Sequence, residues 1–177
     1  MFPVVLKFQR MIFSRPLLVT LSLAITAGVS SASDWMRYEN SRFGTIADVP
    51  LYGFSPLPPP SNGDGQRWLS MDGKSEIGVY GSYVSSIGTW DEYKAFRLNA
   101  LESDGADVTY SAKGPDWFIY SGVADHEIFY IKVLISTDCG IEIANNLYAT
   151  YPEDQKAAFD PIIARMSKSL APGHCSD

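Results

Sequence analysis

Few residues of this chain have the side chains needed for nucleophilic or acid–base catalysis. The histidines are His126 and His174, and the thiols are Cys139 and Cys175. His126 stands in the turn-like stretch 125–127 and would act as a base only if a nucleophile such as Cys139 folded beside it. The chain has no Gly-x-Ser-x-Gly elbow and no glycine-rich phosphate loop followed by lysine. We therefore expect a protein that is not an enzyme.

Two short stretches offer metal-ligand side chains. Residues 62–65, Asn-Gly-Asp-Gly, alternate oxygen side chains with glycine as calcium loops do, but no further acid follows in residues 66–68. Asn-Gly and Asp-Gly also favour tight turns with positive φ, and we favour that interpretation. His174, Cys175 and Asp177 could ligate zinc, but they lie on a tail without a scaffold. The sequence predicts no bound metal and no cofactor.

The first 32 residues are typical of a secretory signal peptide. A basic start is followed by an apolar run over 17–29 and by the small residues Ser30 and Ala32, which suit a cleavage site after Ala32. Met11 could be the true start, because the segment after it is itself a complete signal. We predict removal of residues 1–32 and a single domain over 33–177, found in the periplasm or secreted.

Export would place Cys139 and Cys175 in an oxidising compartment, which permits a disulfide between them. Pairing requires their Cα atoms to lie within about 7 Å, and spacing in the chain does not establish that. The sequence is therefore compatible with both alternatives, a disulfide and two free thiols.

The acidic balance restricts the partners. The net charge is −6 over 177 residues, and the leader contains lysine and arginine but no acid, so cleavage makes the product more acidic. Nucleic-acid binders usually carry a basic patch, and anionic lipids attract basic segments. We expect no nucleic-acid partner and no membrane anchor after cleavage.

Hydrophobic periodicity and turn residues predict eight strands and two helices. The strands are expected over 35–40, 45–49, 67–70, 76–83, 107–112, 117–121, 127–135 and 141–151. Thr89 and Glu92 have the spacing of a capping box, which predicts a helix ending at Gly105. A second helix is expected from Glu153, with a kink or restart at Asp160-Pro161. This order indicates an α+β fold with an antiparallel sheet and two helices, one mid-chain and one C-terminal.

The sequence of the first predicted helix only partly indicates which side of the helix faces the sheet. The apolar side is expected to hold Trp90, Tyr93, Phe96, Ala100 and Leu101, and the cations Lys94 and Arg97 also fall on it. Long cationic side chains can cover apolar surface while their charges reach its border.

The candidate binding residues are Asn62, Asp64, Arg67, Trp68 and Asn145. The first four follow or end the loop 51–65, in which four prolines between 56 and 60 fix φ and lower the entropy lost on binding. Trp68, like Tyr80 and Tyr120, lies on a predicted strand whose outer face could present an aromatic ring. Asn145 falls on an apolar strand face, so either a bulge turns it out or it lines a cavity.

The chain resembles the Mog1/PsbP-like fold. The resemblance rests on Tyr38-x-Asn40-x-x-Phe43-Gly44 with Pro50, a hairpin, a capped helix, a meander and a closing helix that ends in Ser169-Leu170. It also resembles a group of exported alphaproteobacterial domains. The shared stretches are Asn62-Gly63-Asp64-Gly65, Trp117-Phe118-x-x-Ser121-Gly122, Ile128-Phe129-Tyr130 and Tyr151-Pro152…Phe159-Asp160-Pro161-Ile162. The first resemblance implies a mostly non-enzymatic domain that binds other proteins, and the second brings no activity with it.

The expected function is therefore that of a non-enzymatic, protein-binding module at the cell envelope. The main alternative is a small-ligand or glycan-binding periplasmic protein, and an enzyme of unrecognised type is the least favoured. An aromatic-lined pocket containing Asn145 or Arg67 would favour the ligand-binding alternative. A flat apolar patch would favour a protein partner.

Overall fold

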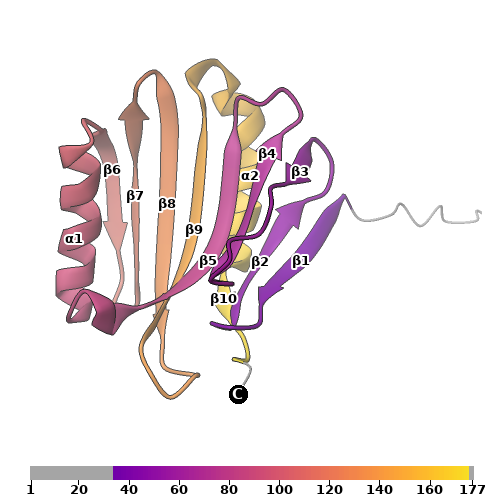
Figure 1. Ribbon diagram of the computed structural model, residues 1–177. Coiled ribbons are helices and arrows are strands. Elements are labelled where there is room, and N and C mark those ends of the chain that lie inside the picture. Colours follow the sequence, from indigo (N-terminus) through magenta and orange to yellow (C-terminus); the bar gives the residue numbers. More distant parts are fainter. Residues whose placement is uncertain (1–33, 176–177) are drawn as a thin grey trace, which may run out of the picture. The chain divides into compact units, whose positions relative to one another are not determined.

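The computed structural model describes residues 34–175, which fold around a seven-stranded antiparallel sheet (Figure 1). In spatial order its strands are β3 (Phe54–Pro56), β4 (Gly65–Ser70), β5 (Glu76–Tyr83), β9 (Ile143–Pro152), β8 (Glu127–Ser136), β7 (Trp117–Ala124) and β6 (Asp107–Lys113). A smaller antiparallel sheet holds β1 (Trp35–Asn40), β2 (Thr45–Pro50) and β10 (Ala171–Pro172). The helices are α1 (Trp90–Ser103) and α2 (Lys156–Ser169). The predicted α+β class is confirmed, and the predicted signal peptide lies outside the described residues.

The large sheet is covered by different elements on its two faces. The cluster beside α2 and β2 contains Val49, Leu147 and Met166, whereas the cluster beside α1 contains Tyr93 and Phe118. Strand β8 contributes alternate residues to both clusters, as its continuous apolar sequence predicted. The hydrophobic burial that holds the fold together therefore comes from two layers on either side of one sheet.

Helix α1 begins where the capping box placed it. The Thr89 hydroxyl accepts from the backbone N–H of Glu92, and the Glu92 carboxylate accepts from the backbone N–H of Thr89 at 2.7 Å. The expected buried face was partly wrong, because Phe96 is 48% exposed. Leu98, which was not assigned to that face, is half-buried, and so is Arg97, which was. Arg97 is thus directed toward the sheet.

The second helix was expected to kink or restart at Asp160-Pro161, and it does not restart there. Helix α2 runs without interruption over Lys156–Ser169 with Pro161 inside it. Proline removes one N–H from the helix ladder. The carbonyl that would have accepted it belongs to Ala157, which is exposed and can bind water instead. A preceding 3₁₀ turn covers Glu153–Gln155.

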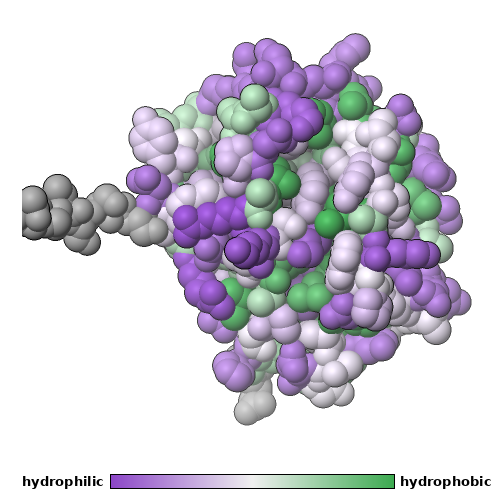
Figure 2. All heavy atoms as spheres, turned by 180° about the vertical axis from the view of Figure 1, so that it is seen from behind, coloured by the Kyte–Doolittle hydropathy of each residue, from purple (hydrophilic) through white to green (hydrophobic). Residues whose placement is uncertain are grey.

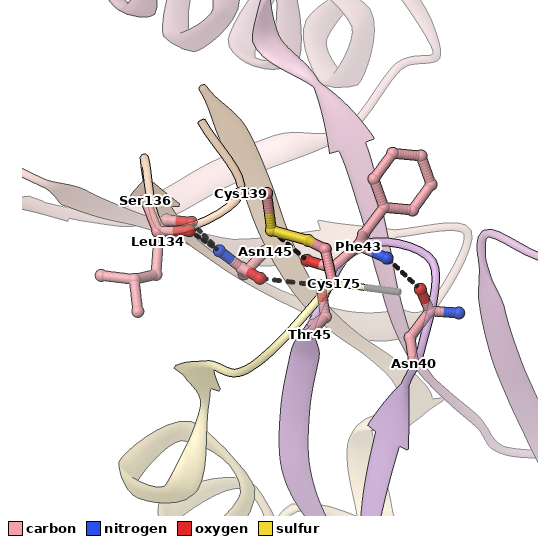
Figure 3. Close-up of a disulfide and its surroundings, with 8 residues drawn as sticks. All are labelled: Asn40, Phe43, Thr45, Leu134, Ser136, Cys139, Asn145 and Cys175. Atoms are coloured by element: carbon pink, nitrogen blue, oxygen red, sulfur yellow. Dashed lines mark hydrogen bonds between the residues drawn. A yellow bond between two sulfur atoms is a disulfide. The ribbon is translucent and has the colours of Figure 1, made fainter. Parts of the chain in front are cut away.

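The two cysteines are joined in the structure. Cys139, between β8 and β9, forms a disulfide with Cys175, with the Cα atoms 5.7 Å apart (Figure 3). The bond fixes the segment after β10 beside the turn that contains Phe43 and Gly44, where the N–H of Gly173 donates to the carbonyl of Gly44. A disulfide in a chain of this size is typical of an oxidising compartment.

Candidate functional site

A pocket of about 370 Å³ lies on the sheet over β4 and β5, with Tyr148 of β9 in its lining. It is lined by Pro60, Asp64, Gly65, Gln66, Arg67, Tyr80 and Tyr148. Two of the candidate residues, Asp64 and Arg67, therefore share one cavity. The expected binding loop supplies its rim through Pro60 and Asp64.

The loop that carries Asp64 is held in place by side chains. The amide of Asn62 donates to the Asp64 carboxylate at 2.8 Å, and Gly63 between them has φ 65°. Such an arrangement is the tight turn that the Asn-Gly-Asp-Gly sequence favoured. Asn40 Nδ2 donates to the carbonyl of Gly63 at 2.9 Å, and Arg42 Nη1 donates to the carbonyl of Asn62. Asn40 and Arg42, at the β1–β2 turn, therefore position the rim of the pocket.

Tyr148 lies flat on the sheet inside the pocket. Gly78 is its neighbour on β5, and a Cβ at that glycine would overlap the Tyr148 ring. The Tyr148 hydroxyl donates to Glu76 Oε1, and Arg67 Nη1 lies 3.5 Å from the same oxygen. Burial, followed by the adjacent Glu76 carboxylate, raises the pKa of Tyr148. The phenol therefore stays protonated near neutral pH and acts as a donor.

Tyr80 forms the other aromatic wall and connects the pocket to α1. Arg97 Nη1 donates to the Tyr80 hydroxyl at 2.8 Å, and burial raises the pKa of Tyr80. The rings of Tyr80 and Tyr148 meet edge to face with centroids 6.2 Å apart. Among residues 34–175, no carboxylate lies within ion-pair distance of Arg97. The sequence did not point to Tyr148 as a site residue, because Tyr148 reaches the pocket only through its pairing with Gly78 on the neighbouring strand.

Trp68 does not line this pocket but borders a separate groove on the other face of the sheet. The side chain is 3% exposed and packs in the cluster beside α2 and β2. Its ring meets Tyr38 edge to face at 5.1 Å. Strand alternation separates the two candidates, because Arg67 and Trp68 are consecutive and must point to opposite faces. Tyr120, at 8% exposure, is likewise buried.

Asn145 is also structural, and both outcomes expected for it were wrong. It is fully buried in a regular part of β9, with no bulge at its position. Its Oδ1 accepts from the Thr45 hydroxyl at 2.8 Å, and its Nδ2 donates to Leu134 O and Ser136 Oγ, both at 3.1 Å (Figure 3). These bonds connect β2 to β8 and β9 beside the disulfide. Asn145 therefore fastens the two sheets together instead of facing a ligand.

The residues considered for catalysis are not assembled into a reactive group. His126 is exposed in a turn with φ 67°, and the sulfur of Cys139 is in the disulfide, so it is not a nucleophile. Cys175 is likewise not a thiolate for zinc. Within residues 34–175, no three His, Cys, Asp or Glu side chains are grouped closely enough to hold a metal ion.

A second surface lies where the loop 51–65 begins. Leu51, Tyr52 and Met71 are 52%, 85% and 81% exposed. The Met71 N–H donates to the carbonyl of Gly53 at 2.9 Å, so these side chains share one corner of the molecule, which we call the apolar corner. Beside it lies a groove of about 350 Å³, lined by Met36, Tyr38, Pro50, Leu51, Phe54, Pro56, Gln66 and Trp68. Contiguous exposed apolar side chains often mark an interaction site.

The face opposite the first pocket also carries a groove. About 640 Å³ in volume, it lies between α2 and strands β6 to β8, and its lining includes Tyr110, Tyr130 and Lys156. Figure 2, which views the molecule from behind, shows hydrophobic residues scattered among hydrophilic ones. That view therefore contains no broad, flat apolar patch.

Comparison with solved structures identifies the fold. The solution structure of cyanobacterial PsbP (CyanoP) from Synechocystis sp. PCC 6803 matches with a TM-score of 0.60 at 11% identity, over 83% of this chain and 97% of the other. The Ran-binding protein Mog1p of Saccharomyces cerevisiae matches with a TM-score of 0.51 at 12% identity, over 79% of this chain and 96% of the other. No protein-family model and no curated protein sequence matches the chain. The chain therefore has the PsbP/Mog1 fold, as the resemblance of its sequence implied.

No helix within residues 34–175 combines the length and the apolar character that crossing a bilayer requires.

Proposed function

We propose that this chain is an exported, non-enzymatic domain that binds a protein partner in the cell envelope through the apolar corner. The observation that carries the proposal is the exposure of Tyr52 and Met71 at one corner beside an apolar groove. Exposed aromatic and methionine side chains are enriched in protein interfaces. The leader sequence and the disulfide support export.

The fold is compatible with this function. One of its structural neighbours is a Ran-binding protein, so the fold hosts protein recognition in at least that case. Fold alone does not determine function, and the partner must therefore be recognised by a surface of this chain. The short strand β3 is stiffened by Pro56 beside that surface, which limits the entropy that binding removes.

The test uses the tagged full-length protein expressed in its producing cells. Envelope proteins captured by the wild type are compared with those captured by a Tyr52→Ser, Met71→Ser double variant. A Phe96→Ser, Tyr110→Ser double variant is the matched control, since it removes exposed aromatic rings from other places. The captured partner is then purified and titrated against each variant.

We expect the corner variant to bind the partner at least about tenfold more weakly and the control to bind as the wild type does, because truncating a residue that anchors an interface costs about 2 kcal/mol or more. Equal affinities for the corner variant and the wild type would overturn the proposal. Export is tested separately by N-terminal sequencing, which should begin at Ser33. A cytoplasmic product that retains the leader would contradict it.

A further inference from the structure

The geometry points to a second binding site in this protein: the pocket between Tyr80, Tyr148, Asp64 and Arg67 binds a neutral saccharide ring. This site is separate from the apolar corner and does not depend on the proposed protein partner. We call it the tyrosine pocket.

Its aromatic walls suit the carbon face of a sugar. Tyr148 rests with one face on Gly78, which leaves the other face directed into the pocket. Tyr80 stands edge to face against it, so the two rings present an apolar surface with a bend. A pyranose has an apolar face made of C–H bonds and a polar rim of hydroxyls. Tyrosine, with an apolar body and a polar tip, matches both parts.

The polar groups around the rings match the hydroxyl rim. Asp64 supplies a carboxylate that accepts hydrogen bonds, and Arg67 supplies a guanidinium that donates several in a fixed plane. Neighbouring sugar hydroxyls can donate to the first and accept from the second. A fully apolar ligand would displace water from both groups and offer them no hydrogen bond in exchange, which is unfavourable.

The charges of the site favour a ligand without net charge. Two acids, Asp64 and Glu76, and two cations, Arg67 and Arg97, surround the tyrosines. Asp64 is close enough to Tyr80 to contribute to its raised pKa. Because the formal charges cancel, neither an anion nor a cation finds a complementary field here.

The side chains are held in position before any ligand arrives. Asn62 holds the Asp64 carboxylate, and the backbone carbonyl of Asp64 accepts from the N–H of Gly81 at 2.8 Å. Glu76 holds the Tyr148 hydroxyl, and Arg97 holds that of Tyr80. A pocket fixed in this way loses little entropy on binding. Its volume, about 370 Å³, lies near the lower end of the range for small-molecule sites, about 300–1,000 Å³.

In the experiment, the protein without its predicted leader (residues 33–177) is titrated with defined trisaccharides. Binding is measured by ligand-observed NMR and by calorimetry. The neutral probes are maltotriose, cellotriose and the trimer of N-acetylglucosamine. The charged probes are trigalacturonate and the glucosamine trimer. We expect at least one neutral probe to bind with a Kd in the micromolar to millimolar range, and the charged probes to bind more weakly. No binding of any neutral probe at about 20 mM, or tighter binding of a charged one, would overturn the inference, since a Kd of 1 mM already corresponds to only about −4 kcal/mol.

Variants assign the binding to the tyrosine pocket. Asp64→Asn and Arg67→Ala should each lower the affinity for the neutral probe at least fivefold. The matched controls Asp154→Asn and Lys168→Ala alter exposed charges outside the pocket and should leave this affinity unchanged. Equal affinities in all four would contradict the site. The Tyr52→Ser, Met71→Ser variant should retain saccharide binding, so failure of the protein-binding proposal and failure of this one give different results.

Discussion

Replacing Asn145 by alanine tests whether the buried amide fastens the two sheets. The change removes three hydrogen bonds at once. Thr45 is fully buried, so its hydroxyl is left without an acceptor, which costs about 1–3 kcal/mol. Leu134 and Ser136 are half-buried and can regain water, so each lost bond there costs about 0.5–1.5 kcal/mol. We expect the free energy of unfolding to fall by about 4 kcal/mol.

The assay is urea unfolding followed by tryptophan fluorescence, with Asn99→Ala on the exposed side of α1 as the matched control. The control should change stability by no more than about 0.5 kcal/mol. Pairing Asn145→Leu with Thr45→Val replaces both hydrogen-bonding groups and should recover at least half of the loss, since removing both partners can be nearly neutral. A loss below about 1 kcal/mol for Asn145→Ala would refute the reasoning.

Three further changes test other parts of the fold. Replacing Cys139 and Cys175 by serine opens a loop with a separation of 36 residues and should lower stability by roughly 4 kcal/mol on the chain-entropy model, measured by thermal unfolding without reductant. The backbone N–H and then the hydroxyl of Thr89 lower the pKa of Glu92 below 4.5. The charged carboxylate therefore stabilises α1 above its unfolded pKa, and this contribution is lost as pH falls through the folded value. Glu92→Gln should accordingly make stability less dependent on pH below about 5, as unfolding curves at several pH values would reveal. Gly122→Ala places a Cβ against a backbone oxygen of β6 and should cost about 1–3 kcal/mol in the same unfolding assay.

The strands that sequence predicted are those with enough residues to show a pattern. Alternation identified β5, and continuous apolar residues identified β8 as a covered strand. Strands β3 and β10 were missed because they have only three and two residues and each ends in proline. They are strands because β4 and β2 offer edges to pair with, and that information lies far away in the chain.

Some residues of the candidate site could likewise be predicted from the sequence, and others could not. Asp64 and Arg67 could be found because they belong to a turn and the strand that follows it. Tyr148 could not, since it reaches the pocket only through the pairing of β9 with β5. The helical wheel placed Arg97 on the apolar side of the helix, but it does not show what the guanidinium contacts there. The hydrogen bond that Arg97 donates to the Tyr80 hydroxyl can be recognised only once α1 is placed against the sheet.

Both proposed surfaces use the segment 51–64, and its contacts keep the two apart. Leu51 and Tyr52 at its start form the apolar corner, whereas Asp64 at its end borders the tyrosine pocket. Between them, β3 pairs with β4 and the N–H of Leu57 donates to the carbonyl of Arg67 at 2.9 Å. A segment fixed to the sheet in its middle transmits little movement from one end to the other, because a packed element does not deform continuously. A protein partner and a saccharide could therefore be held by one short segment without competing for it.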